Sequence, residues 1–191
     1  MAPPANPRNA PHEVRIIGGQ WRRSKLPVLD APGLRPTPDR VRETLFNWLG
    51  QDLTGWRVLD AFAGTGVLGF EAASRGALEV QMLEYDARLS QALSTSRTKL
   101  CATSVAITQA DAIAWMQRTA SRFDLVFLDP PFDANLFEPA LNAALGCVVE
   151  QGWIYLESPR ECAADALAAL GLERYRHARA GAVHAHLLRR M

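Results

Sequence analysis

Short apolar runs alternate with longer amphipathic stretches along the chain after Trp56. Short runs rich in β-branched and aromatic residues predict strands, whereas apolar positions spaced three or four apart predict helices. We expect strands at 57–60, 80–84, 105–108, 123–129 and 153–157, and helices at 67–75, 87–100, 112–119, 136–145 and 162–170. Because parallel neighbours need crossover connections, this alternation predicts an α/β fold with a parallel sheet covered by helices on both faces.

The end of the chain departs from this alternation. Residues 173–179 and 183–189 have the pattern of strands, but only Ala180 to Ala182 join them, which is too short for a crossover. We therefore predict a mostly parallel seven-stranded sheet that ends in an antiparallel hairpin. His184 and His186 alternate on the last strand and share a face. Since no third ligand stands at metal-binding spacing, we expect surface histidines and no metal site.

The N-terminal part has a different pattern. Two β-type runs, VRIIGG and QWRRSKLPVL, flank Gly18 and Gly19, which suit the positive φ angles of a tight turn. We predict a basic β-hairpin there, followed by an amphipathic helix in LRPTPDRVRETLFNWLG with Thr37 as its cap. We divide the chain into a disordered tail (1–13), an N-terminal hairpin and helix (14–50) and a main domain (51–191).

Charge is distributed unevenly along the 191 residues. Through Arg42 there are eight Lys and Arg against three Asp and Glu, a net charge of +5, whereas the remainder carries −4. A basic arm on a mildly acidic body suits a polyanion such as RNA, although it is also compatible with an ordinary solvated surface. No apolar run approaches the roughly 20 residues that cross a bilayer, and the first residues lack a signal peptide's apolar core. We expect a cytoplasmic monomer without a membrane partner.

A glycine-rich segment, VLDAFAGTGVLGFEAA, follows the first strand of the main domain. It matches GxGxxG from Gly64 onward, and Glu84 lies twenty residues further, so a dinucleotide site is one reading. The carboxylate of Asp60 beside the loop disfavours a pyrophosphate and suits a ligand with an ammonium and a sulfonium, such as S-adenosylmethionine. Glu84 can bind ribose hydroxyls under either reading. Asp111 can accept a bond from an adenine amine or cap a helix.

The most specific feature is FDLVFLDPPF, in which a strand runs into Asp129, Pro130, Pro131 and Phe132. Two prolines stiffen this turn and leave carbonyls free to accept hydrogen bonds. An exocyclic base amine is a poor nucleophile because its lone pair is delocalised. If Asp129 and the Pro130 carbonyl each accept one N–H, the lone pair is directed at a methyl donor. Phe132 offers a flat face to an unstacked base.

With these motifs in order, the chain resembles the class I, Rossmann-like S-adenosylmethionine-dependent methyltransferases. More narrowly, it resembles the bacterial family that methylates the N2 amine of guanine 966 in 16S ribosomal RNA, through RIIGGQWRRSKLPV, GLRPTPDRVRETLFNWL, VLDAFAGTGVLGFEAASRGA, LEYD and VFLDPPF. The resemblance implies that this RNA, in the small ribosomal subunit or its assembly intermediate, is the partner. The C-terminal AGAVHAHLLRR is only loosely similar to the family's ending.

The resemblance also implies roles for single residues. Asp129, Pro130 and Phe132 would hold the target base. The cofactor would contact Asp60, Ala61, Gly64, Gly66, Glu84, Asp111, Ala112, Thr37 and Arg42. Candidate RNA contacts are Arg22, Arg23, Lys25, Arg35 and Arg40.

Three other functions remain open at this point. The same tetrapeptide would serve a methyltransferase for another planar amine, such as adenine N6 or a glutamine side chain. The GxGxxG match leaves a nicotinamide-dependent oxidoreductase, and the basic arm leaves an RNA-binding assembly factor with an inactive cleft.

Overall fold

The computed structural model describes residues 13–31, 37–131 and 136–191, and it contains the predicted seven-stranded sheet. The strand order is β5-β4-β3-β6-β7-β9-β8. The strands are β3 (Arg57–Asp60), β4 (Glu79–Glu84), β5 (Val105–Gln109), β6 (Phe123–Leu128), β7 (Val148–Ser158), β8 (Leu172–Ala180) and β9 (Val183–Arg190). β3 to β7 pair in parallel, and β9 runs antiparallel to both β7 and β8. The predicted sheet and its C-terminal hairpin are confirmed.

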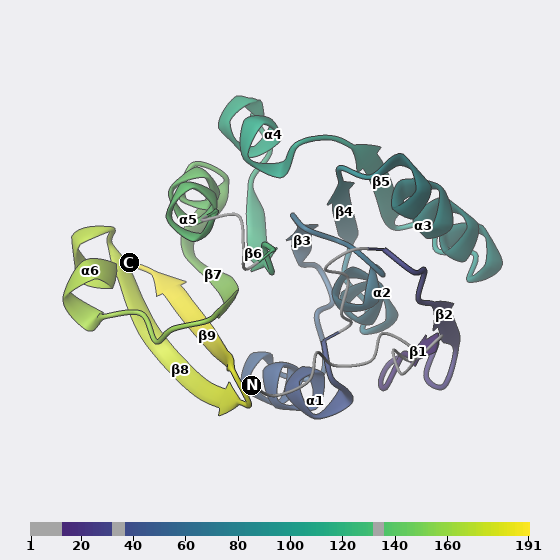
Figure 1. The fold of residues 1–191 in the computed structure, drawn as a ribbon, viewed down its shortest axis with the longest axis horizontal. Coiled ribbons are helices and arrows are strands. Elements are labelled where there is room, and N and C mark those ends of the chain that lie inside the picture. The colour runs from purple at the N-terminus through teal and green to yellow at the C-terminus, as the bar shows by residue number, and fades with distance from the viewer. Residues whose placement is uncertain (1–12, 32–36, 132–135) are drawn as a thin grey trace, which may run out of the picture.

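Helices cover both faces of this sheet (Figure 1). One face carries α1 (Asp39–Leu49), α2 (Val67–Ser74) and α3 (Ala87–Lys99), and the other carries α4 (Ala112–Arg118), α5 (Phe137–Leu145) and α6 (Ala164–Ala169). Each face has its own cluster of buried apolar side chains. None of the helices in the described ranges is long and apolar enough to cross a membrane.

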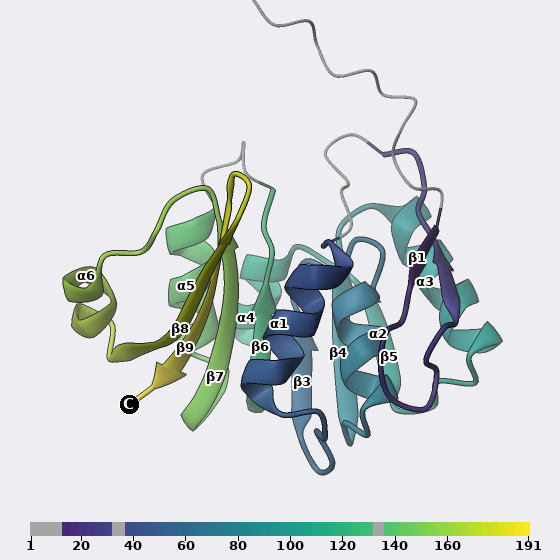
Figure 2. The ribbon, with the colours of Figure 1, turned by 90° about the horizontal axis from the view of Figure 1, so that it is seen from below.

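The N-terminal hairpin consists of β1 (Glu13–Arg15) and β2 (Lys25–Pro27), which lie beside α3 (Figure 2). The prediction of a tight turn at Gly18 and Gly19 was wrong, because the chain reverses over residues 16–24 instead. The two glycines lie against the end of α2. A Cβ at Gly19 would come within 1.9 Å of the Ser74 carbonyl oxygen. Glycine is therefore required for close packing of the hairpin on the helix.

Ser74 fastens this hairpin loop to α2. Its hydroxyl donates to the Gly18 carbonyl (2.6 Å) and accepts from the Trp21 amide (2.9 Å), and its own carbonyl accepts from the Gln20 amide (2.8 Å). The Trp21 ring packs against the buried cluster of the same face. Trp21 therefore anchors the hairpin to the body.

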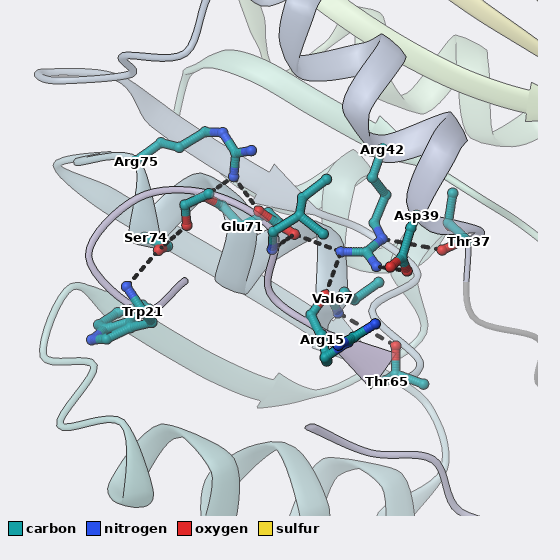
Figure 3. Close-up of polar contacts among 12 residues, drawn as sticks. Arg15, Trp21, Thr37, Asp39, Arg42, Thr65, Val67, Glu71, Ser74 and Arg75 are labelled. Atoms are coloured by element: carbon teal, nitrogen blue, oxygen red, sulfur yellow. Dashed lines mark hydrogen bonds and ion pairs between the residues drawn. The ribbon is translucent and has the colours of Figure 1, made fainter. Parts of the chain in front are cut away.

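A buried ion network joins the hairpin, α1 and α2 (Figure 3). The carboxylate of Glu71 is 0% exposed and pairs with Arg42 (Nη1 to Oε1, 2.5 Å) and with Arg75. It also accepts the Ile17 amide of the hairpin loop (2.7 Å). Nη1 of Arg42 donates in addition to the Arg15 carbonyl (2.8 Å). One carboxylate thus connects three elements that are distant in the sequence.

The start of α1 differs from the expectation. The helix begins at Asp39 with Pro38 in the cap position, and no side chain accepts a capping hydrogen bond. Thr37 is buried, and its hydroxyl bonds to the carboxylate of Glu157 instead. The buried residues of the helix are Val41, Arg42, Leu45 and Phe46.

The hairpin and α1 share one core with the sheet. Val14, Ile16 and Phe46 belong to the same buried cluster as Val58 of β3 and Val80 of β4. Burying a large apolar side chain contributes about 1.5 to 3 kcal/mol. The described part of residues 14–50 is therefore stabilised by the main domain and stabilises it in turn.

We expect Glu71→Gln to lower the free energy of unfolding by about 3 to 5 kcal/mol, because it removes the carboxylate that pairs with two buried guanidinium groups and leaves Arg42 only its pair with the half-exposed Asp39. Urea unfolding monitored by circular dichroism measures this. The control is Glu79→Gln, which removes a half-exposed pair with Arg57 (3.0 Å) and should cost less than about 1 kcal/mol. Equal losses in the two variants would refute a dominant role of the network.

Candidate active site

Acidic side chains gather where the parallel strands end. Asp60 ends β3 and Glu84 ends β4, Asp129 follows β6 directly, and Glu157 lies one residue before the end of β7. Since β4, β3, β6 and β7 are successive parallel neighbours, these four carboxyl groups lie along one edge of the sheet. In open α/β sheets, ligands bind at this edge.

The glycine loop between β3 and α2 lies on this edge. Gly64 and Gly66 have positive φ angles of 52° and 75°. A Cβ at Gly66 would lie 2.4 Å from Leu93 of α3, so a larger residue there would push the loop away from the helix. Glu84 accepts the Gly64 amide at Oε2 (2.8 Å) and the Asp86 amide at Oε1 (2.8 Å). Glu84, which the sequence predicts to bind the ribose, therefore also holds the glycine loop in place.

Asp60 is the buried charge of this loop. Asp60 is 2% exposed, and its Oδ2 accepts a hydrogen bond from the Gly69 amide of α2 (2.9 Å). Burial raises the pKa of Asp60 to about 7 against the opposing effect of this hydrogen bond, and the negative charge of Glu84 adds to the rise. A carboxylate in this position is stabilised by a bound cation.

Asp129 stands at the end of the neighbouring strand. Burial raises its pKa well above the ordinary value, and the negative charges of Glu157 and Asp60 raise it further. Pro130 is buried. Phe132 lies outside the described residues. The structure thus brings Asp129 and Asp60 together at the ends of neighbouring strands, and their roles toward a base and a cofactor stay predictions.

Glu157 was missed by the sequence reasoning. It is 4% exposed, and its Oε1 accepts the hydroxyl of Tyr155 (2.9 Å). Burial raises the pKa of Glu157, whereas its hydrogen bonds from Tyr155 and Thr37 oppose the rise. The only signal in the sequence was an acidic residue near the end of an apolar strand. Its position beside Asp129 follows from the pairing of β6 with β7.

Further along the edge, Asp111 and Ala112 lie at the start of α4. Asp111 is exposed, and its Oδ1 accepts the Ala114 amide (2.8 Å), so it caps the helix. Ala112 is buried, and so is Ala61 after β3. Capping occupies Oδ1 of Asp111 and does not conflict with an adenine contact through Oδ2.

Two of the residues predicted to cover the cofactor are enclosed by protein. Arg42 is 0% exposed, and its guanidinium donates to Thr37, Asp39, Glu71 and the Arg15 carbonyl. A direct contact of Arg42 with a cofactor or RNA does not fit this enclosure, and the residue instead positions α2 behind the glycine loop. Thr37 is hydrogen-bonded to the carboxylate of Glu157, which lies at the end of β7.

Four of the predicted RNA residues lie in the N-terminal hairpin and on α1. Arg22 and Arg23 are exposed in the hairpin loop, and Arg40 is exposed on the first turn of α1. Lys25 is also exposed but pairs with Glu13 (2.6 Å). Arg35 lies outside the described residues.

Known proteins resemble nearly the whole chain. A family described as Conserved hypothetical protein 95 matches residues 14–189. Ribosomal RNA small subunit methyltransferase D of Escherichia coli K12 is 44% identical over 151 residues, which cover 78% of this chain and 76% of the relative. The protein of the same name from Haemophilus influenzae is 43% identical over 163 residues, covering 80% and 82%.

Solved structures agree with these relatives. A protein from Escherichia coli superposes with a TM-score of 0.82 and 36% identity over 93% of this chain and 98% of its own. A precorrin-6y C5,15-methyltransferase from Geobacter metallireducens has a TM-score of 0.67 at 17% identity over 86% and 95%, which shows a common fold. The predicted Rossmann-like methyltransferase fold is confirmed.

The raised pKa of Asp60 predicts a pH-dependent stability. The pKa of Asp60 is about 7 in the folded protein and has the ordinary value of 3.8 in the unfolded chain. The proton on Asp60 therefore stabilises the folded state fully below pH 3.8, and this stabilisation is lost as the pH rises through 7. In that range we expect Asp60→Asn to gain stability over wild type by about 1.4 kcal/mol per pH unit. Urea unfolding between pH 4 and 8 measures the difference. Parallel curves for the two proteins would contradict the raised pKa.

Proposed function

The chain belongs to the family described as Conserved hypothetical protein 95, and we propose that it is an S-adenosylmethionine-dependent methyltransferase for the N2 amine of guanine 966 in 16S ribosomal RNA. The single observation that carries the reaction is the placement of Asp129 and Pro130 beside the glycine loop, at one edge of the sheet. The proposed substrate class, ribosomal RNA of the small subunit, is inferred from relatives that are 43% and 44% identical over most of the chain.

The glycine-loop side of the edge suits S-adenosylmethionine, which supplies an electrophilic methyl group on a sulfonium when bound. Asp60 is a buried carboxylate that a cationic ligand would stabilise. The half-buried Gly64 of the loop has no side chain that would keep a ligand from approaching the backbone there. Glu84 and Asp111, with Ala112, lie further along the edge in the order of ribose and adenine.

The Asp129 side of the edge suits the target amine. The Asp129 carboxylate and the Pro130 carbonyl would each accept one N–H, which holds the amine in place and aims its lone pair. An amine that accepts a methyl group would become positively charged at nitrogen and would have one proton to give up. The nearby Asp129 carboxylate, with its raised pKa, is suited to take it. Phe132 would stack on the base.

The proposed substrate also implies a partner and a cellular location. The RNA would be reached in the small ribosomal subunit or its assembly intermediate, in the cytoplasm, by a monomer. Arg22, Arg23, Lys25 and Arg40 would contact phosphates, as would Arg35. The two alternatives with other substrates, a methyltransferase for adenine N6 or glutamine and a nicotinamide-dependent oxidoreductase, lack support from the named relatives.

The direct test is methyl transfer to small subunits purified from a strain that lacks this protein. Wild-type protein with radiolabelled S-adenosylmethionine should produce N2-methylguanosine, identified by mass spectrometry of digested RNA. We expect Asp129→Ala to lose transfer while cofactor affinity by calorimetry stays within a few fold, because the carboxylate contacts the amine. The exposed-residue variant Asp165→Ala is the control. Normal turnover in Asp129→Ala, or label in another nucleoside, would overturn the assignment.

The exposed arginines predict the salt dependence of RNA binding. Replacing Arg22 and Arg23 by Ala should flatten the plot of log affinity against log salt by about 0.7 to 0.9 per lost phosphate contact. Lys25→Ala should do less, because Lys25 already has Glu13 as its partner. Binding titrations at several salt concentrations measure the slope, with calorimetry of the cofactor as the control. An unchanged slope would place the RNA surface elsewhere.

A further inference from the structure

Three of the chain's four histidines meet on one face of the C-terminal hairpin. His177 of β8 stands opposite His186 of β9, and His184 lies two residues before His186 on the same face. The ring nitrogens available as ligands all lie within 4.8 Å of one another. The expectation of surface histidines was wrong for His186, which is 0% exposed. The missing third ligand comes from the neighbouring strand, where sequence spacing could not show it.

The first pair of rings already shares a polar contact. Nε2 of His177 lies 2.9 Å from Nδ1 of His184, and the two ring planes are nearly parallel, at 16°. For this contact to be a hydrogen bond, one of the two nitrogens carries a proton that the other accepts. Two ligands of a tetrahedral zinc ion, each about 2.0 to 2.1 Å from the metal, are separated by about 3.3 Å. A small outward movement of two half-buried side chains would therefore make room for an ion.

The third ring presents a lone pair as well. Nε2 of His186 accepts the Cys162 amide (3.1 Å), so that nitrogen is unprotonated. Cys162 lies in the loop between β7 and α6 and not in a regular element, so its amide can give up this bond. Metal ligation requires an unprotonated ring nitrogen, and the bond from the Cys162 amide shows one on His186.

We propose that His177, His184 and His186 bind one divalent transition-metal ion of the zinc class. His177 binds through Nε2, His184 through Nδ1 and His186 through Nε2. The proton between the first two rings moves to the other nitrogen of its own ring, so each ring donates one lone pair and stays neutral. Three imidazoles leave a fourth tetrahedral position for water.

The charges around the cluster are compatible with a cation. Arg174 lies close enough to affect His177 and His186, but its guanidinium pairs with the carboxylate of Glu161. Glu161 in turn interacts with His177 and His184. The two opposite charges offset each other beside the site. A bound ion would tie the edge strand β8 to β9.

The test uses full-length protein without an affinity tag, dialysed against a chelator and titrated calorimetrically with zinc chloride. We expect one ion per chain, and a rise in melting temperature with zinc but not with magnesium. His184→Gln and His177→Gln should each weaken binding by roughly tenfold or more and remove the thermal shift. Both residues are half-buried, so these variants are better suited than a change at the fully buried His186.

Two matched variants separate this site from other zinc ligands. His12→Gln removes the remaining histidine, which lies outside the described residues, and Cys162→Ser removes the nearest thiol of the loop; both should bind zinc as wild type does. Absence of stoichiometric binding would overturn the proposal. Equal affinity in wild type, His177→Gln and His184→Gln would overturn it too.

Discussion

The buried carboxylate of Glu71 is the interaction on which the arrangement of the N-terminal half depends. It lies on α2, the helix that begins at the glycine loop, and it binds a guanidinium from α1, another from its own helix and an amide from the hairpin loop. A buried charge is tolerated only where partners surround it. The segment before the sheet is thereby held in one position relative to the loop that forms the cofactor side of the site.

A second constraint acts at the carboxyl ends of the strands. Asp60, Asp129 and Glu157 are carboxyl groups at the ends of three neighbouring strands, and within the described ranges none of them forms an ion pair with a cationic side chain. Crowded, poorly solvated carboxyls hold protons more tightly than isolated ones. The edge therefore favours a cationic ligand and can accept a proton near neutral pH. Both properties suit methyl transfer from a sulfonium to an amine.

The C-terminal hairpin shows how far local pattern can mislead. His184 and His186 were expected to be surface residues, yet their strand β9 lies between β7 and β8. An inner strand buries side chains on both faces, so polar residues there must find partners. The histidines find them in the neighbouring strand and in the loop after β7.

The sequence by itself determined the order of strands and helices, the antiparallel ending and the positions of Asp60, Glu84 and Asp129 at strand ends, because periodicity and connection length are local properties. Only the tertiary structure decided what depends on pairing between distant segments. It placed Glu157 beside Asp129 and buried Arg42 in an ion pair with Glu71. It also packed Gly19 against Ser74 and paired His177 with His186 on neighbouring strands. Strand register and helix docking select these neighbours, and no spacing along one chain encodes them.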